Sequence, residues 1–346
     1  MFLLDYTSFA TMILHDSKPE VFKMSQILLV ASERGLWRVP IEAALPSSKR
    51  QLSVDVPTSA VVALAGNSGR LAALCSDGRL LLWDSAARAF REGPSLELDE
   101  SEPQCACMAK DGTLYLGTCP PQVWRWREDE GLLELSPLSG LAARERWQGL
   151  EAPYEPRVTG LWAEGDSVWA SISVGGVYCH REGRWRVHGA DELPRDARDL
   201  LFAAPRFYLA TGLGLWAFDP LSGAVHRLGL PPRAAFAARL ARSMGPADGV
   251  VVAAAPGPPA TWRGPDGSRM SVWHFAGDAA VGRPLAGPFH GTIQDLLLHE
   301  DVVWAATDDG ELWRIPLSGP APEQALIADL PAPRALFLVD ERGSRG

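Results

Sequence analysis

An aromatic residue that recurs seven times in similar surroundings is the feature of this sequence that most constrains its fold. In each copy, a run of small and apolar residues leads into a short turn rich in Gly, Ser or Pro, and the aromatic residue follows that turn. Successive copies are 38 to 57 residues apart, with a mean of 46. The seven residues are Trp37, Trp83, Trp124, Tyr178, Trp216, Trp273 and Trp313. We interpret each copy as a β-hairpin, because two apolar β-rich runs joined by a turn are typical of paired antiparallel strands.

Further strands flank most of these hairpins. One precedes the hairpin, as in DLLFAAPRFYLAT (199–211), and another follows it, as in RWRVHG (184–189). Four short antiparallel strands in a unit of about 40–50 residues are typical of a β-propeller blade. One such sheet buries little apolar surface alone, so the units must pack face to face around an axis. We therefore predict an all-β fold, a seven-bladed β-propeller with four-stranded antiparallel blades.

Both ends of the chain are predicted to complete one blade. The 33 residues after Trp313 and the 13-residue step from Met24 to Trp37 together equal one mean repeat. The run RALFLVDERG (334–343) has the pattern of an innermost strand, whereas the N-terminal part supplies ILLVAS, GLWRVP and QLSVDV but no inner strand. The termini would thus close the ring and leave no exposed sheet edge.

These repeats resemble those of a broad superfamily. The segment VWAATDDGELWRI (303–315) is similar to repeats of sensor-type and sialidase-like propellers, and Trp83-Asp84 is the single WD dipeptide. Over about residues 25–343 the chain resembles the superfamily of seven-bladed propellers with degenerate WD-like, YVTN-like or BNR-like repeats. The resemblance implies the fold and little chemistry, because many functions share that fold.

Composition narrows the classes of partner and the compartment. The net charge of −9 opposes binding to nucleic acid or to an anionic membrane. Five cysteines are too few for a secreted disulfide scaffold, so we predict a cytoplasmic protein. The 29 Arg against 4 Lys indicate a bacterial-type, GC-rich genome. Residues 1–23 have no basic leader and are predicted to be an appendage or a misassigned start, with 24–346 as a single propeller domain.

Two long loops are predicted on one face of the propeller. Residues 136–157 join the third and fourth blades, and residues 255–270 interrupt the sixth. Long loops in a compact domain often carry function, although a Pro- and Gly-rich surface loop without a role is the alternative. Their large side chains are Arg144, Trp147, Tyr154, Arg157, Trp262 and Arg263.

Charged residues recur at one position of the predicted inner strands. Aligned by a shared Leu, the fifth, sixth and seventh blades carry Asp199, Arg239 and Asp295 there. Buried charges are costly unless they are paired. Two interpretations follow: a structural arc of salt bridges around the channel, or a pocket for a small polar ligand. The same alignment matches the pair Arg198–Asp199 of blade five with Thr159–Gly160 in blade four and with Ala106–Cys107 in blade three.

Catalysis stays open at this stage, although the pattern favours a non-enzymatic protein. Glycoside hydrolysis needs two carboxylates, for which Asp199 and Asp295 are candidates, with Arg239 and His290 nearby. Sialidase-like sites also need an arginine cluster and a Tyr nucleophile, and Tyr154 is the single Tyr in a long loop.

A metal site is a weak prediction, and no cofactor is expected. Cys105 and Cys107 share one face of an inner strand, and a turn at Asp111-Gly112 would return Cys119 beside Cys105. Three thiols could bind a soft metal ion, but cysteines that simply pack in a buried strand are commoner.

Two functions from different classes compete. The leading one is a non-enzymatic binding or scaffolding propeller that recognises a protein or peptide partner through its loop face. The alternative is a small-molecule sensor, hydrolase or lyase at the channel mouth. Asp199, Asp295 and His290 converging on a cavity would favour the alternative. Candidate partner-binding residues are Arg144, Trp147, Tyr154, Arg157, Arg198, Trp262 and Arg263.

Overall fold

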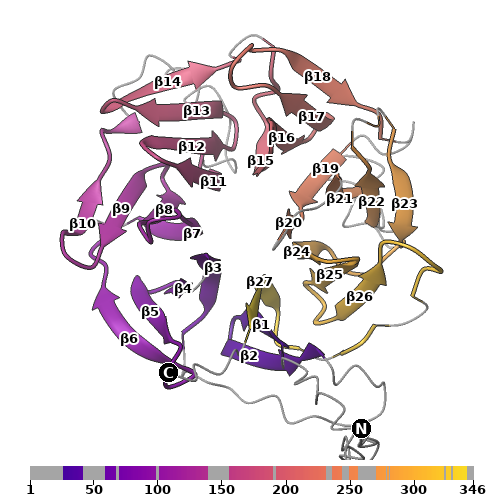
Figure 1. Ribbon diagram of the computed structural model, residues 1–346, viewed down its shortest axis with the longest axis horizontal. Coiled ribbons are helices and arrows are strands. Elements are labelled where there is room, and N and C mark those ends of the chain that lie inside the picture. Colours follow the sequence, from indigo (N-terminus) through magenta and orange to yellow (C-terminus); the bar gives the residue numbers. More distant parts are fainter. Residues whose placement is uncertain are drawn as a thin grey trace, which may run out of the picture.

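Seven β-sheets are arranged as a ring around a central channel (Figure 1). This computed structural model describes residues 26–41, 59–67, 70–98, 101–138, 156–189, 192–230, 236–243, 249–255, 270–277, 279, 281–322, 325–328 and 330–340. The fold is the predicted seven-bladed β-propeller. Within the described part of the chain, no helix is long and apolar enough to cross a membrane.

The strands of each blade follow one another outward from the channel. Blades one to three contain, in chain order, β1 (Gln26–Ser32), β2 (Gly35–Pro40), β3 (Val61–Asn67), β4 (Arg70–Cys75), β5 (Arg79–Asp84), β6 (Ala89–Ser95), β7 (Glu102–Met108), β8 (Leu114–Cys119), β9 (Val123–Arg127) and β10 (Gly131–Glu134). Blades four and five contain β11 (Val158–Glu164), β12 (Ser167–Ile172), β13 (Gly176–Arg181), β14 (Arg184–His188), β15 (Ala197–Ala203), β16 (Arg206–Thr211), β17 (Gly214–Phe218) and β18 (Val225–Leu228).

Blades six and seven are less regular. They contain β19 (Phe236–Leu240), β20 (Arg242–Ser243), β21 (Val250–Ala255), β22 (Ser271–Phe275), β23 (Arg283–Ala286), β24 (Ile293–His299), β25 (Val302–Thr307) and β26 (Leu312–Pro316). The short strand β20 does not continue along β21. It pairs in parallel with β24 of blade seven instead, with Arg242 opposite Leu297. The inner strand of blade six therefore bends toward the next blade just where its second arginine lies.

The last strand, β27 (Pro333–Asp340), closes the ring. It pairs antiparallel with β1, Phe337 opposite Leu29, and the order β2–β1–β27 puts the C-terminal strand beside the channel (Figure 1). The predicted closure by both termini is thus confirmed. The strand predicted at QLSVDV (51–56) and the segment 1–23 lie outside the described residues.

Seven hydrophobic clusters hold the ring together, one at each interface between neighbouring blades. Each repeated aromatic residue lies on the third strand from the channel and packs in the cluster that its blade shares with the preceding one. Trp313, for example, meets the Phe289 ring edge-on at 5.0 Å. An aromatic side chain that buries about 150–250 Å² contributes roughly 4–6 kcal/mol at about 25 cal/mol per Å². The repeat identified in the sequence is therefore the packing unit between blades.

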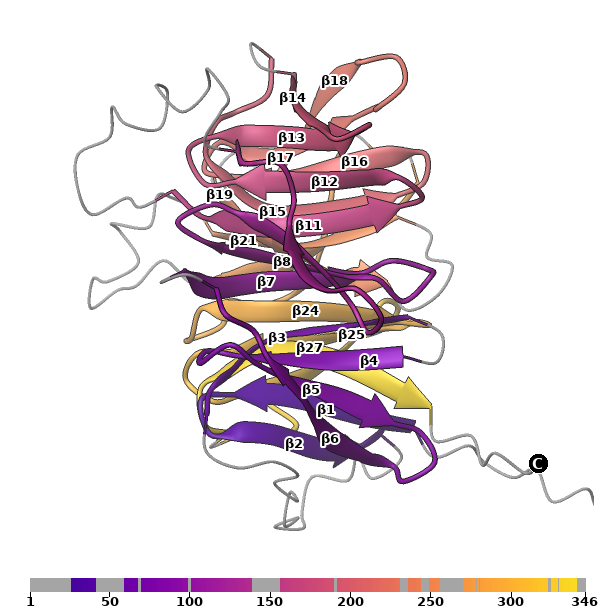
Figure 2. The same ribbon diagram turned by 90° about the vertical axis from the view of Figure 1, so that its left-hand side faces the viewer.

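The innermost strands all run in one direction along the channel, as β11 does from left to right in Figure 2. The channel therefore has two different mouths. At one mouth the innermost strands begin, and at the other they end.

Candidate functional site

Every innermost strand carries a β-bulge near its first residues. In β15, Ala197 pairs with Thr211 and Asp199 with Ala210, so Arg198 between them has no pairing partner of its own. A bulge bends the strand and redirects a side chain. The residues at this bulge are Val62, Gln104, Thr159, Arg198, Ala238, Gln294 and Arg334, and all seven line one cavity of about 350 Å³ at the mouth where the strands begin.

Four arginines line this same cavity, and we call it the arginine mouth: Arg157, Arg198, Arg239 and Arg334. Two of them are paired with acids at the rim. Arg198 Nε lies 3.0 Å from Asp196 Oδ1, and Arg334 Nη2 donates to Glu33 Oε1 at 2.7 Å. The guanidinium groups of Arg157 and Arg239 make no hydrogen bond or close ion pair with any residue that the structure describes. A chain of net charge −9 thus presents open cationic donors at one point of its surface.

The residue after the bulge carries the predicted channel carboxylates. Asp199 and Asp295 occupy the same register position in blades five and seven, and Arg239 occupies it in blade six, as the sequence alignment predicts. Asp199 Oδ2 accepts from Leu240 N of the next blade at 3.0 Å, and Asp295 Oδ2 accepts from Leu336 N of the next blade at 2.7 Å. Both carboxylates therefore join neighbouring blades through backbone N–H groups.

The interpretation as an arc of salt bridges placed Arg239 as the partner of both acids, and for Asp295 this was wrong. Arg242, rather than Arg239, makes the ion pair with Asp295, at 2.7 Å between Nη2 and Oδ2. The same guanidinium donates to Leu336 O at 2.9 Å and, through Nη1, to Leu64 O of blade two at 2.8 Å. We call this set of contacts the crossbar, because it joins blade six to blades seven, one and two across the channel. Alignment by the shared Leu could not find it, because the bend at β20 carries Arg242 out of its own blade.

Burial sets the titration of Asp199. It raises the pKa of this carboxyl to about 6, against the opposing effects of the Arg239 guanidinium and of the Leu240 and Leu200 N–H groups. The negative charge of Asp295 also contributes to this raised pKa. Asp199, Asp295 and Arg239 line a smaller cavity of about 120 Å³ below the arginine mouth.

The cysteines are not arranged as predicted. The hairpin register places Gly117 opposite Cys105 and Glu102 opposite Cys119, so the expected pair of thiols does not form. Cys105 Sγ lies 3.6 Å from Val158 O of blade four, and Cys119 Sγ lies 3.7 Å from Pro156 O. The pairing within blade three also corrects the alignment of its inner strand.

Gln104–Cys105, not Ala106–Cys107, is therefore the pair that matches Arg198–Asp199. Burial raises the pKa of the Cys105 thiol to about 12 and that of Cys107 further, which disfavours the thiolate that a metal ion needs. The described residues contain no group of three His, Cys, Asp or Glu able to hold a metal ion.

The remaining predicted residues fall into two sets. Arg157 lies at the arginine mouth, whereas His290 is exposed in the connection between β23 and β24 and lines neither channel cavity. Of the three residues whose convergence on a cavity would favour the alternative function, Asp199 and Asp295 line one cavity and His290 does not. Five predicted loop residues lie outside the described residues: Arg144, Trp147, Tyr154, Trp262 and Arg263.

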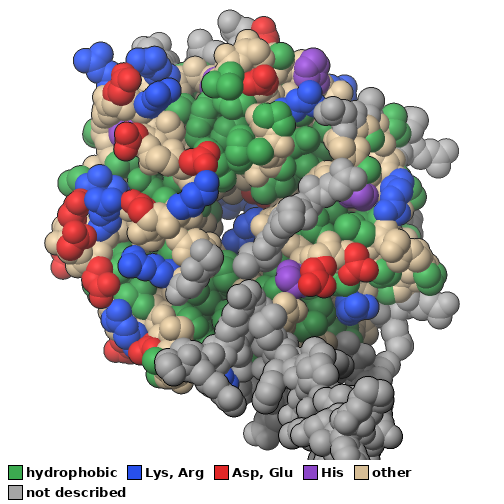
Figure 3. Space-filling model, in the orientation of Figure 1, with side chains coloured by type: hydrophobic (Ala, Val, Ile, Leu, Met, Phe, Trp, Pro, Cys, Tyr) green, Lys and Arg blue, Asp and Glu red, His purple; other side chains and the backbone are tan. Residues whose placement is uncertain are grey.

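The opposite mouth has a different lining, which the sequence analysis missed. We call it the apolar mouth, a cavity of about 550 Å³ defined by Trp162, Leu201, Phe202, Leu298 and Phe337. The Trp162 and Phe202 rings are 4.3 Å apart, centroid to centroid. Figure 3 shows hydrophobic side chains gathered around the opening on this face. The available signal was an aromatic residue near the end of two successive inner strands.

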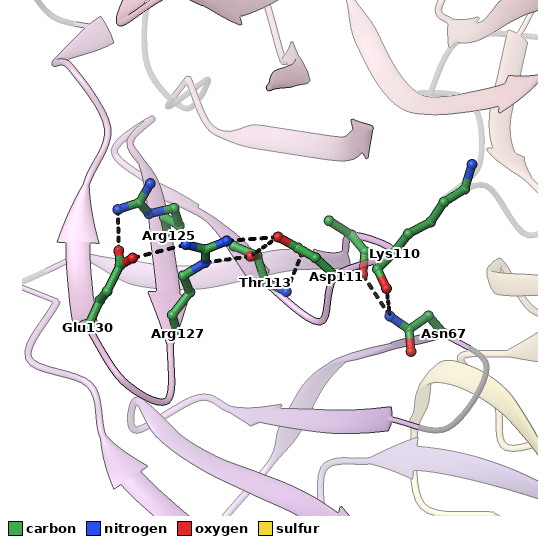
Figure 4. A network of polar contacts seen from close by, with 8 residues as sticks. Asn67, Lys110, Asp111, Thr113, Arg125, Arg127 and Glu130 are labelled. Atoms are coloured by element: carbon green, nitrogen blue, oxygen red, sulfur yellow. Dashed lines mark hydrogen bonds and ion pairs between the residues drawn. The ribbon is translucent and has the colours of Figure 1, made fainter. Parts of the chain in front are cut away.

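A fourth cavity, of about 650 Å³, lies between blades two and three. Figure 4 shows its polar wall. Arg127 reaches Asp111 at 2.8 Å and Glu130 at 2.9 Å, and its Nε donates to Thr113 Oγ1. Asn67 Nδ2 donates to Ala109 O at 2.7 Å, which links blade two to the hairpin turn of blade three. These charges are mutually satisfied, so we interpret this wall as structural.

Comparison with known proteins supports the fold and no more. Neither a family model nor a curated protein sequence matches the chain. Among solved structures, it is similar to the WD40 β-propeller domain of Doa1, with a TM-score of 0.60 and 11% identity over 84% of this chain and 88% of that one. It is also similar to virginiamycin B lyase from Staphylococcus aureus, with a TM-score of 0.56 and 10% identity over 81% and 92%.

A computationally designed protein, Ika8, is a third similar structure, with a TM-score of 0.51 and 18% identity over 78% of this chain and 76% of that one. A WD40 domain, a lyase and a designed protein thus share this architecture. The function must therefore be argued from the site.

Proposed function

We propose that this protein is a non-enzymatic binding propeller that recognises a protein or peptide partner at the arginine mouth and the loops around it. One observation carries the proposal. The acids in the channel are engaged in contacts between blades, whereas the guanidinium groups of Arg157 and Arg239 at the mouth remain open to a ligand. Buried carboxylates that bond to neighbouring blades, together with guanidinium groups at an opening that lack a hydrogen-bond partner, favour ligand binding over catalysis.

The carboxylates argue against acid–base catalysis. A general acid or base must exchange a proton with a substrate within hydrogen-bond reach. Asp199 accepts from two backbone N–H groups, Leu200 and Leu240, and Asp295 accepts from Leu336 N and Arg242. Turning either side chain toward a substrate would leave buried N–H groups of the next blade without a partner.

The position of the mouth supports a macromolecular partner. The two long loops predicted to bind a partner attach at this face. Arg157, the last residue of the first loop, lines the mouth, and Ala255, the first residue of the second loop, pairs with Phe236 at the start of β19. We further propose that the protein acts in the cytoplasm, which its five free cysteines favour. The net charge of −9 argues against nucleic acid and anionic membranes as partners.

A small-molecule sensor is the second candidate. Asp199, Asp295 and Arg239 converge on the 120 Å³ cavity, and polar groups around a small cavity suit a compact ligand.

Capture from the native host tests the proposal. Tagged wild-type protein would be compared with Arg157→Glu and with a matched control, Arg314→Glu, which is exposed on β26. We expect a stoichiometric protein partner, identified by mass spectrometry, that Arg157→Glu loses and Arg314→Glu retains. A partner bound equally by all three proteins, or a bound metabolite without any protein, would overturn the proposal.

A further inference from the structure

We infer that the arginine mouth is a carboxylate-binding site, which holds the ligand's carboxylate between Arg157 and Arg239 above the channel acids. The inference rests on the proposed function and names the chemical group by which the partner is recognised. It concerns acidic side chains, the C-terminal carboxylate of a peptide or a free organic acid, which offer the same group.

The two guanidinium groups supply the charge and the geometry. Each is planar and offers parallel N–H donors that match the two oxygens of a carboxylate. Both side chains line the 350 Å³ cavity without a hydrogen-bonding partner among the described residues. The charges of Asp199 and Arg239 attract each other, but the Asp199 oxygens accept hydrogen bonds from the backbone N–H groups of Leu200 and Leu240. The N–H donors of Arg239 therefore stay available to a ligand.

Neutral donors complete the site. The Gln104 side-chain amide lines the cavity and makes no hydrogen bond to a described residue. Ser173 Oγ accepts from Arg157 N at 3.0 Å, which leaves its hydroxyl hydrogen free to donate. Such neutral donors around the two guanidinium groups favour an anion whose oxygens point in different directions, as carboxylate oxygens do.

The acids below the mouth limit the charge that the site accepts. Asp199 and Asp295 line the cavity directly beneath, so a doubly charged phosphate would meet two carboxylates at close range. A singly charged carboxylate gains from the arginines and suffers less of this repulsion. The geometry therefore favours a carboxylate over a phosphate.

Binding should be coupled to protonation. Asp199 shares its cavity with charged and titratable groups from five other strands: Arg239 on β19, Arg242 on β20, Asp295 on β24, Arg334 on β27 and the Cys105 thiol on β7. The Thr159 hydroxyl on β11 lines it too. A bound carboxylate adds negative charge near Asp199 and favours its protonated form. Affinity should therefore rise as pH falls from 7 to 5, with uptake of a proton on binding.

Fluorescence anisotropy with defined probes tests the inference on the full-length protein. The main probe is a labelled Gly-Glu-Gly-Glu-Gly-Glu peptide blocked at both ends, and its control has Gln for Glu. A second labelled probe is an all-Gly peptide with a blocked N-terminus and a free C-terminal carboxylate. Binding of acetate and of inorganic phosphate, which carry no label, is measured by isothermal titration calorimetry at pH 7.5. Protein variants are Arg157→Gln, Arg239→Gln and the control Arg314→Gln.

We expect at least one carboxylate probe to bind, with about tenfold loss or more in Arg157→Gln and Arg239→Gln and no loss in Arg314→Gln. Arg157 is exposed, so its variant tests binding without a folding defect. Equal binding of the Gln peptide, tighter binding of phosphate, or wild-type binding by both mouth variants would overturn the inference.

The two proposals fail separately. If a captured partner depends on Arg157 but no carboxylate probe binds, the carboxylate inference is wrong and the proposed function stands. If acetate binds and neither peptide does, the carboxylate inference stands and the protein-partner proposal is wrong.

Discussion

The two mouths of the channel are built from the same seven innermost strands but differ in chemistry. Where the strands begin, a bulge in each strand turns side chains into the opening, and four arginines lie there. Where they end, Trp162, Phe202 and Phe337 form an apolar lining. The crossbar from Arg242 to Asp295 and Leu64 lies between them. A repeated backbone therefore sets equivalent positions, and the side chains at those positions divide the ring into two distinct surfaces.

The largest expected effect comes from removing the innermost strand of blade one, which lines both mouths as the other innermost strands do. Strand β27 contributes Arg334 to one mouth and Phe337 to the other, and it covers β1. Deleting residues 334–340 should open the ring and abolish cooperative thermal unfolding, because blade one loses its innermost strand. Calorimetry would measure this, and an unchanged melting temperature would contradict the closure.

Breaking the crossbar should lower the stability of the fold by a smaller amount, and it should also weaken the separation between the two mouths. Arg242→Ala leaves the buried Asp295 carboxylate without its cation. We expect about 3 kcal/mol lower free energy of unfolding, at the low end for a buried pair because Arg242 is partly exposed. Urea denaturation would measure it against Arg314→Ala, and equal stability of the two variants would rule out a structural crossbar.

The pH dependence of stability should reveal the raised pKa of Asp199, which lines the cavity below the arginine mouth. The native pKa of Asp199 is about 6, above its ordinary value near 3.8, so the native state binds more protons than the unfolded state between about pH 4 and 6. The contribution of Asp199 therefore favours folding as pH falls through this window and is lost as pH rises. Asp199→Asn should remove it.

The measurement is the difference in melting temperature between wild type and Asp199→Asn from pH 4 to 7. Because other groups titrate equally in both proteins, this difference isolates Asp199. We expect wild type to gain relative to the variant as pH falls, and a constant difference across the window would contradict the raised pKa.

The smallest effect is expected from the apolar mouth. Phe202→Ser makes a half-buried side chain at that mouth polar, and Phe202 lines neither of the two cavities that contain Arg239. Carboxylate probe binding should stay within about twofold of wild type, since the crossbar and channel wall separate the two linings. A tenfold loss in the same anisotropy assay would show that the mouths are coupled.

The repeat alone determined the blades, their number and the closure, because one aromatic residue per unit must pack between neighbouring sheets. It also determined that Asp199, Arg239 and Asp295 are equivalent, since a shared Leu defines the strand register. Local pattern decides these features, and local pattern is visible in a sequence.

Tertiary structure decided which charges meet. Arg242, rather than Arg239, pairs with Asp295 because blade six bends toward blade seven at β20. Gly117 lies opposite Cys105 because of the bulge at Gln104. A bulge inserts one unpaired residue into a strand, and its position depends on the pairing with the neighbouring strand, so one short strand's sequence does not reveal it. The chemistry of each mouth follows from contacts between strands far apart in the sequence.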